Sequence, residues 1–160
     1  MKIVNINKCD VANGPGIRVS IFVSGCRHHC KNCFNSQAWD FEVGTPYSEK
    51  ARDLIFCYAD KPWVDGITIL GGEPLEPENQ LELVEFLEAF KERFPTKTVW
   101  LYTGFTEKEL HEPSCRAHTL PLLHILNLVD VLVDGPYIEE LRDPSLRFRG
   151  SSNQNIINLH

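Results

Sequence analysis

The order of hydrophobic and polar positions along the chain predicts four strands. Residues 18–23 alternate and are rich in β-branched side chains, and the runs 67–70, 98–103 and 129–133 are short and apolar. Runs of this length that end at Gly, Asp or Ser-Gly are typical of strands. Each of the four runs is followed by a loop of glycine and polar residues.

Helical spacing predicts two longer helices and two shorter ones between these strands. Ser48 is placed to cap a helix over residues 49–59, and residues 78–94 form a second helix that a proline ends. Residues 106–111 and 119–126 are weaker helical stretches. The expected apolar stripes are Ala51, Leu54, Ile55 and Tyr58 in the first helix, and Leu81, Val84, Leu87 and Phe90 or Lys91 in the second.

Strands that alternate with helices predict an α/β fold with a mainly parallel sheet, because parallel strands need crossover connections. The sheet is expected to be open or a partial (β/α) barrel, in a single domain over residues 1–160. Ligands of such sheets bind at the carboxyl ends of the strands, so these ends are expected to form one site. They are Gly25-Cys26, Gly71-Gly72-Glu73, Thr103-Gly104 and Asp134-Gly135. The tail 143–160 lacks periodicity and is expected to wrap the body.

Length and composition narrow the classes of function. The 160 residues, 42% of them hydrophobic, suffice for one core and leave no room for a second catalytic domain. A net charge of −6 with scattered Lys and Arg argues against a nucleic acid partner. No apolar run approaches the ~18 residues of a membrane span, and the N-terminus is too polar for a signal peptide. A soluble, cytoplasmic protein with no membrane partner is therefore expected.

Three of the six cysteines lie within one short loop, at Cys26, Cys30 and Cys33. This spacing suits three corners of a 4Fe-4S cluster and leaves the fourth iron open, whereas electron-transfer clusters generally use four cysteines. The amino and carboxylate groups of S-adenosylmethionine are able to fill that corner. The pattern therefore predicts a cluster whose fourth iron either binds a substrate such as this cofactor or is completed by a distant cysteine.

Two alternatives remain open on spacing alone. A structural zinc ion would take His28 or His29 as its fourth ligand, although structural zinc usually takes its ligands as two separated pairs. An electron carrier would need a fourth cysteine, either Cys9 or Cys115, and neither has helpful neighbours. Cys57 lies among apolar residues of a predicted helix and is expected to be a small buried side chain.

The Cys-x3-Cys-x2-Cys loop resembles that of the radical S-adenosylmethionine superfamily. Several further segments resemble the glycyl-radical activating enzymes within it, and in particular the family that activates anaerobic ribonucleoside-triphosphate reductases. These segments are Asn13-Gly14-Pro15-Gly16-Ile17-Arg18, Phe22-Val23-Ser24-Gly25-Cys26, Cys33-Phe34-Asn35 with Trp39, Asp134-Gly135 and Arg149-Gly150-Ser151-Ser152-Asn153-Gln154. The resemblance spans nearly the whole chain.

The resemblance implies a role for each site residue. Cys26, Cys30 and Cys33 would bind the cluster. The cofactor-binding residues would be Asn32, Cys33 and Phe34 at the nucleoside, Gly71, Gly72 and Glu73 at the methionine amino group, and Thr103 and Asp134 at the ligand or a cation. Capping of the following turn is an equal alternative for Thr103 and Asp134. Two positions depart from the pattern, because Asn32 replaces the usual aromatic residue and Pro136 stands where relatives can have a lysine.

The implied reaction needs a one-electron donor such as reduced flavodoxin. Reductive cleavage of S-adenosylmethionine would yield a 5′-deoxyadenosyl radical that removes a hydrogen atom from a glycine of the large reductase subunit. Activation of another glycyl-radical enzyme, such as pyruvate formate-lyase, is the nearest alternative. A non-catalytic iron–sulfur carrier and a zinc-stabilised binding module are the others.

Overall fold

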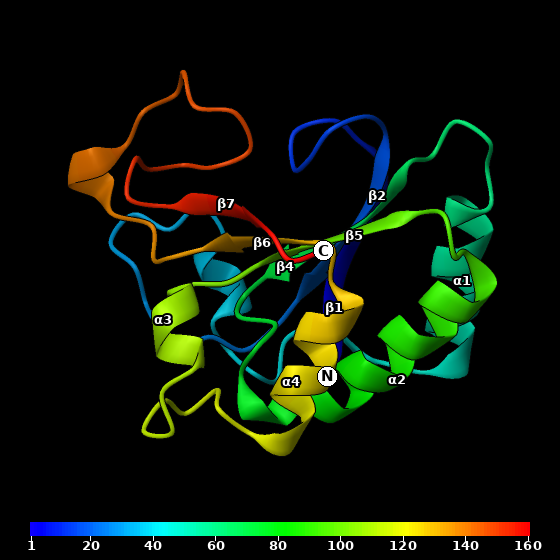
Figure 1. The fold of residues 1–160 in the computed structure, drawn as a ribbon, viewed down its shortest axis with the longest axis horizontal. Coiled ribbons are helices and arrows are strands. Elements are labelled where there is room, and N and C mark those ends of the chain that lie inside the picture. Colours follow the sequence, from blue (N-terminus) through cyan, green and yellow to red (C-terminus); the bar gives the residue numbers. More distant parts are fainter.

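The computed structural model describes residues 1–160, and its seven strands form one mixed sheet in the order β3-β1-β2-β4-β5-β6-β7 (Figure 1). The strands are β1 (Lys2–Asp10), β2 (Arg18–Val23), β3 (Thr45–Pro46), β4 (Gly66–Gly71), β5 (Thr98–Tyr102), β6 (Val131–Asp134) and β7 (Asn155–Asn158). Strands β2, β4, β5 and β6 run parallel, while β1, β3 and β7 pair antiparallel with their neighbours. The predicted α/β fold with a parallel centre is confirmed.

Four α-helices connect or flank these strands. They are α1 (Glu49–Ala59), α2 (Pro77–Arg93), α3 (Glu107–Leu110) and α4 (Leu120–Leu128), with 3-10 turns η1 (Ser36–Ala38) and η2 (Glu139–Leu141). Ser48 caps α1 as predicted, since its hydroxyl accepts a bond of 3.3 Å from the Ala51 amide. None of the helices combines the length and the apolar character that crossing a bilayer requires.

The parallel strands are added in one direction, from β2 through β4 and β5 to β6. Right-handed crossovers then place the connecting helices on one face of the sheet. Figure 1 shows α1, α2 and α4 together on that side. Phe56 of α1 packs against Phe86, Phe90 and Phe94 at the α2 side, with ring centroids 5.5 to 6.0 Å apart.

The other face of the sheet has a smaller core. Trp100 and Val133 are buried there, and Phe148 packs edge-on against Trp100 with ring centroids 5.6 Å apart. Phe148 belongs to the aperiodic tail, which continues into β7 and pairs with β6. The expectation that the tail wraps the body is confirmed, while β1, β3 and β7 were not predicted as strands.

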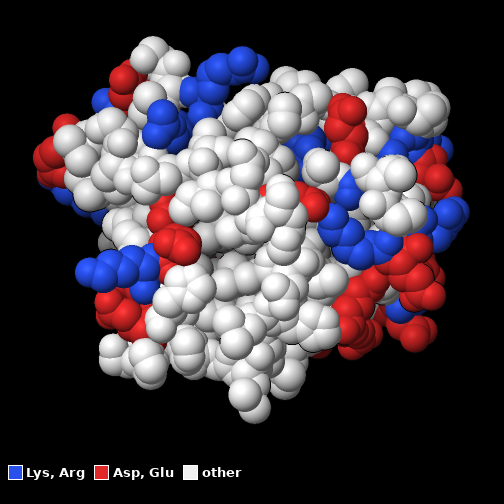
Figure 2. Space-filling view, in the orientation of Figure 1, with Lys and Arg blue, Asp and Glu red and all other residues white.

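The predicted helix stripes are wrong at two leucines. In α1 the buried side chains are Ile55 and Ala59, while Leu54 is exposed. In α2 Leu81 is 74% exposed, while the neighbouring Gln80 is buried and accepts a bond of 2.6 Å from the Thr119 hydroxyl. Figure 2 shows a mostly uncharged area over α4, with charged side chains gathered at either side. Cys57 is exposed as well, so its predicted burial is also wrong.

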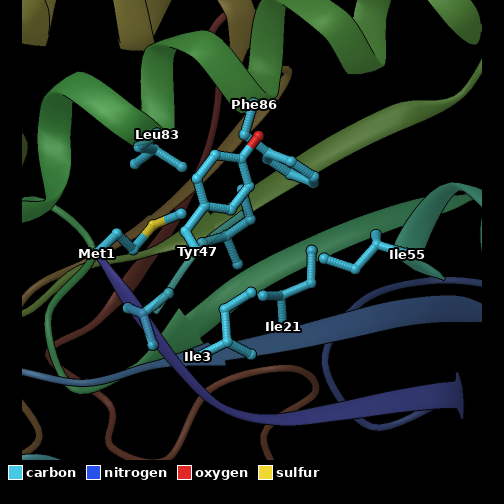
Figure 3. A pocket seen from close by; sticks show the side chains of 9 residues that line it. Met1, Ile3, Ile21, Tyr47, Ile55, Leu83 and Phe86 are labelled. Carbon is cyan, nitrogen blue, oxygen red and sulfur yellow. The ribbon is translucent and has the colours of Figure 1, made fainter. Parts of the chain in front are cut away.

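The apolar pocket in Figure 3 lies inside the core and not at the cysteine loop. Its internal volume is about 10 Å³, which is at the lower limit for one water molecule. The Tyr47 hydroxyl in its wall has no hydrogen-bond partner, and burial raises the pKa of Tyr47 to about 12. The nine lining residues are Met1, Ile3, Ile21, Val23, Tyr47, Ile55, Ile69, Leu83 and Phe86.

Candidate iron–sulfur site

The cysteine loop begins where β2 ends at the edge of the parallel sheet. Its two ends lie side by side, because the Gly25 amide donates to the Ala38 carbonyl at 2.8 Å and the Cys26 amide to the Trp39 carbonyl at 3.0 Å. Cys26 is buried, whereas Cys30 and Cys33 are partly accessible. The loop is therefore closed at its base and open toward solvent at its tip.

Two non-glycine residues in the loop have left-handed backbone conformations. The φ angles of His29 and Asn32 are 51° and 58°, a conformation that costs energy for residues with a side chain. The Cys33 amide also donates to the Cys30 carbonyl at 3.1 Å, which makes a tight turn between these two cysteines. The loop thus contains a tight turn at Cys30–Cys33 and two left-handed residues.

Backbone amides lie close to two of the three sulfur atoms. Burial raises the pKa of Cys26 and of Cys30, and it is opposed by the backbone amides of His28 and His29 at Cys26 and by that of Tyr137 at Cys30. All six cysteines of the chain are free thiols. Amide donors to sulfur are what iron–sulfur sites use to adjust the cluster potential. These features fit a cluster held by Cys26, Cys30 and Cys33.

The two histidines of the loop have other partners. His28 Nε2 lies 2.9 Å from a Glu73 carboxylate oxygen, and the His29 ring stacks on Trp39 with centroids 4.4 Å apart. No three His, Cys, Asp or Glu side chains converge on one metal-ion position. A cubane differs from a single ion in this respect, since each thiolate binds a separate iron.

The two glycines at the end of β4, Gly71 within the strand and Gly72 just after it, pack against β2 and the cysteine loop. A Cβ on Gly72 would stand 2.7 Å from the Gly25 carbonyl oxygen and 2.8 Å from that of Ala38. Gly71 has a φ of 123°, and a Cβ there would stand 2.4 Å from the Val23 nitrogen. Glycine is therefore required by the close approach of two backbones.

The Glu73 side chain joins three of the predicted strand ends. One carboxylate oxygen accepts bonds from the Leu75 amide and the Thr103 hydroxyl, each at 2.9 Å. The other accepts from the Gly104 amide at 2.7 Å and is the oxygen that faces His28. The Thr103 amide in turn donates to the Val133 carbonyl at 2.9 Å. The ends of β4 and β5 and the loop after β2 therefore meet at Glu73, and the expectation that all four strand ends form one ligand site stays a prediction.

Comparison with known proteins places this site in a family. Residues 12–157 match the family described as a 4Fe-4S single cluster domain. The chain is 35% identical to a protein of Escherichia coli K12, over 94% of both chains, and 39% identical to one of Vibrio cholerae, over 91% of this chain and 90% of the other. A phage T4 protein is 35% identical over 94% of this chain and 90% of its own. All three are named anaerobic ribonucleoside-triphosphate reductase-activating protein.

The chain belongs to this activating-protein family. The similarity to these relatives and the 4Fe-4S match each cover more than nine tenths of the chain, including the cysteine loop. The resemblance inferred from the motifs is therefore confirmed at the level of the family.

Of four further cofactor-binding residues predicted from the activating-protein motifs, two are exposed to solvent and two are buried. Asn32 is exposed, and Phe34 is 80% exposed with its ring free of protein contacts on most sides. Thr103 and Asp134 are buried and bonded within the protein. The Thr103 hydroxyl accepts from the Phe105 amide at 3.2 Å, and Asp134 accepts from the Glu107 amide at 2.7 Å. The capping alternative describes the contact of Thr103, whereas Asp134 bonds α3 and β7 and not the turn that follows it. A ligand role for either residue stays a prediction.

The Asn13–Arg18 segment that also carries the family resemblance lies away from the cysteines. Arg18 begins β2 at the amino end of the sheet, and its buried guanidinium donates to the Thr68 hydroxyl at 2.8 Å and the Thr98 hydroxyl at 3.0 Å. Burial lowers the pKa of Arg18 to about 10. This segment holds the strands together and contributes nothing to the cluster loop directly.

Pattern reasoning missed a buried carboxylate beside the cluster loop. Glu76 is fully buried and accepts two bonds from Arg116, at 3.0 and 3.1 Å, and two from Arg27. Burial by itself raises the pKa of Glu76, but the hydrogen bonds from Arg116 and Arg27 bring it below its ordinary value. The sequence offered one indication of this carboxylate, which is the charged residue Arg27 between two of the cysteines, for which an acidic partner was to be expected.

Thiol reactivity of the metal-free protein is expected to follow exposure and acidity. Burial raises the pKa of Cys26 to about 11, so about 0.1% of this thiol is ionised at pH 8. Cys9 and Cys57 are exposed. Iodoacetamide should therefore label Cys9 and Cys57 at least tenfold faster than Cys26, as measured by peptide mass spectrometry over time.

Cluster assembly provides the control for this labelling experiment. Reconstitution with iron and sulfide should protect Cys26, Cys30 and Cys33 and leave Cys9 and Cys57 reactive, because bound thiolates are not free nucleophiles. Labelling of Cys26 at the rate of Cys57 in the metal-free protein would contradict the buried position of this thiol.

Proposed function

We propose that this protein activates an anaerobic ribonucleoside-triphosphate reductase by generating a glycyl radical on it. Membership of the activating-protein family over nearly the whole chain is the observation that carries the proposal. The three free thiols in one loop, with amide donors at two of them, support a 4Fe-4S cluster as the redox group. S-adenosylmethionine is the proposed second cofactor, because three cysteines leave one iron open.

When bound, the cluster would supply one electron to the sulfonium of S-adenosylmethionine, which releases methionine and a 5′-deoxyadenosyl radical that takes a hydrogen atom from the reductase glycine. The residues of the chain itself position the cysteine thiols that would bind the cluster. Cys26 is held by the closed base of the loop, and Cys30 by the tight turn in which its carbonyl accepts from the Cys33 amide. No general acid or base is required of the protein.

The proposed nucleoside contacts lie at the open tip of the loop. Asn32, Cys33 and Phe34 are consecutive, and the left-handed turn at Asn32 changes the chain direction just before Cys33. The 80% exposed Phe34 ring offers a free aromatic face on which a base would stack. Stacking from the residue after the third cysteine compensates for the polar residue before it.

The proposed methionine contacts lie at Gly71, Gly72 and Glu73. The Glu73 amide and carboxylate already bond within the protein. The interaction with the amino group is therefore assigned to the remaining backbone groups of this turn. Thr103 and Asp134 complete the proposed site at neighbouring strand ends.

Several broader expectations accompany this function. We interpret the open sheet, with its helices on one face, as part of a (β/α) barrel, and the 160 residues as a single domain. Reduced flavodoxin is the proposed one-electron donor, and the cytoplasm the proposed location. The small chain has little material for a lid of its own, so the reductase is proposed to cover the site with its glycine-bearing segment.

The test combines the reduced protein, S-adenosylmethionine and the anaerobic reductase under anoxia. Electron paramagnetic resonance should show a glycyl radical whose doublet collapses when the glycine is α-deuterated, and 5′-deoxyadenosine should form in step with it. Binding of the reductase should raise the rate of S-adenosylmethionine cleavage that yields a glycyl radical. It should also suppress the cleavage that yields none.

Pyruvate formate-lyase serves as the competing target in the same experiment. A radical on that enzyme, and none on the reductase, would overturn the proposed target while leaving the cysteine chemistry intact. Cleavage of S-adenosylmethionine without any protein radical, with either target present, would overturn the activating role itself.

A further inference from the structure

The two residues after Cys26 are each tied to a buried carboxylate of the segment that follows β4. His28 Nε2 lies 2.9 Å from Glu73, and the Arg27 amide and guanidinium donate to Glu76 at 2.9 and 2.7 Å. Glu73 is 1% exposed and Glu76 is 0% exposed. The Arg27 and His28 side chains are thus each bonded to a buried carboxylate, and the half-exposed Arg27 also pairs with Glu78 at the surface.

Main-chain bonds join the same two segments. The Glu73 amide donates to the Gly25 carbonyl at 2.7 Å, and the Asn79 side-chain amide donates to the Ser24 carbonyl at 3.1 Å. Gly72 packs directly on the Gly25 carbonyl, where a Cβ would stand at 2.7 Å. Polar bonds therefore hold the loop on both sides of Cys26.

The two carboxylates have no capacity left for a ligand. Glu73 accepts from the Leu75 and Gly104 amides and the Thr103 hydroxyl in addition to facing His28. Glu76 accepts a bidentate pair from Arg116, whose guanidinium lies 4.5 Å from the Phe105 ring centroid. A buried carboxylate with four partners is a rigid anchor, because loss of any one donor leaves it undersatisfied.

We propose that Glu73 and Glu76 form an anchoring platform that positions the cysteine loop, Cys26 to Cys33. His28 is the positioning residue, because its contact with Glu73 fixes the backbone of the loop. This inference rests on the proposed cluster at Cys26, Cys30 and Cys33. The Glu73 side chain then acts on cluster geometry and not on S-adenosylmethionine, which differs from the ligand role that the motif resemblance implies. His28 sets the path of the backbone between Cys26 and Cys30 and thereby the direction of both thiols.

Three histidine variants separate positioning from general loop damage. His28→Asn is too short to reach Glu73, His28→Gln restores an amide N–H within reach, and His29→Asn makes the same change at the next residue, whose ring only stacks on Trp39. Asparagine tolerates the left-handed backbone at position 29. Each variant is reconstituted anoxically as the full chain and compared in iron content, midpoint potential and the electron paramagnetic resonance spectrum of the reduced cluster.

His28→Asn should lose at least half of the iron or shift the spectrum and potential of what remains. His28→Gln should recover most of the wild-type values, and His29→Asn should equal the wild type. Glu73→Gln, which places a second donor against His28 and Gly104, should resemble His28→Asn. The dissociation constant for S-adenosylmethionine, measured per intact cluster, should change less than threefold in all four variants.

Two results would overturn the inference. Wild-type iron content, potential and spectrum in both His28→Asn and Glu73→Gln would show that the platform does not position the cluster. A tenfold weaker S-adenosylmethionine affinity in Glu73→Gln with an unchanged cluster would return the carboxylate to a ligand role. A wild-type chain that assembles no cluster would instead refute the proposed function, and this inference with it, so the two failures are distinguishable.

Discussion

Serine substitution at Cys26, Cys30 or Cys33 is expected to abolish cluster assembly. Anoxic reconstitution of the wild type should give about four irons per chain, the content of one cubane, and each variant should retain less than about one. The reason is that a hydroxyl is a poor iron ligand, so each variant lacks one of the three proposed thiolate ligands. Iron and sulfide analysis with the visible absorption spectrum provides the measurement, and radical formation on the reductase should disappear in parallel.

The other three cysteines are matched controls for this prediction. Cys9 is exposed on β1, Cys57 is exposed on α1 and Cys115 packs against the main hydrophobic core. Serine at each should leave iron content and the spectrum unchanged. If Cys9 or Cys115 proved as necessary as the loop cysteines, a four-cysteine electron carrier would replace the open-iron site.

Gly72→Val is expected to disrupt the cluster loop and not only the binding of S-adenosylmethionine. The first atom of any side chain here would stand 2.7 Å and 2.8 Å from two backbone carbonyl oxygens, those of Gly25 and Ala38. Backbone cannot rotate away as a side chain does, so the loop must shift. Overpacking of this kind costs about 1–3 kcal/mol of unfolding free energy. Iron content should fall at least twofold, with Gly72→Ala intermediate.

Gly16→Ala separates this effect from loss of stability alone. Gly16 lies at the other end of the sheet, has a φ of 72°, and a Cβ there would meet the Asp65 side chain. This variant should lower the thermal unfolding midpoint as Gly72→Ala does, yet bind a full cluster in the folded fraction. A Gly72→Val protein with full iron and an undisturbed spectrum, but weak S-adenosylmethionine binding, would contradict the packing argument and favour a direct ligand role.

Sequence patterns predicted some features of the candidate site and not others. The cysteine spacing predicted the cluster ligands, which remain a proposal, and the glycine-rich and polar ends of the strands predicted the edge of the sheet at which these cysteines lie. The pattern did not indicate that Glu73 would be saturated by four donors, because three of these come from residues 28, 103 and 104, far along the chain. Nor did it locate Glu76, which reads as an ordinary surface acid before a helix.

The sequence by itself determined the helices and the four parallel strands, since strand and helix periods and the Ser48 cap depend on residues close together in the chain. It also determined the family, because the motifs are contiguous. The tertiary structure alone decided which helix faces are buried, as Leu54 and Leu81 show, and it alone brought the tail strand β7 against β6. It also decided that Gly72 and Glu73 hold the cysteine loop. Burial and hydrogen bonding of this kind depend on partners distant in sequence, which no local pattern specifies.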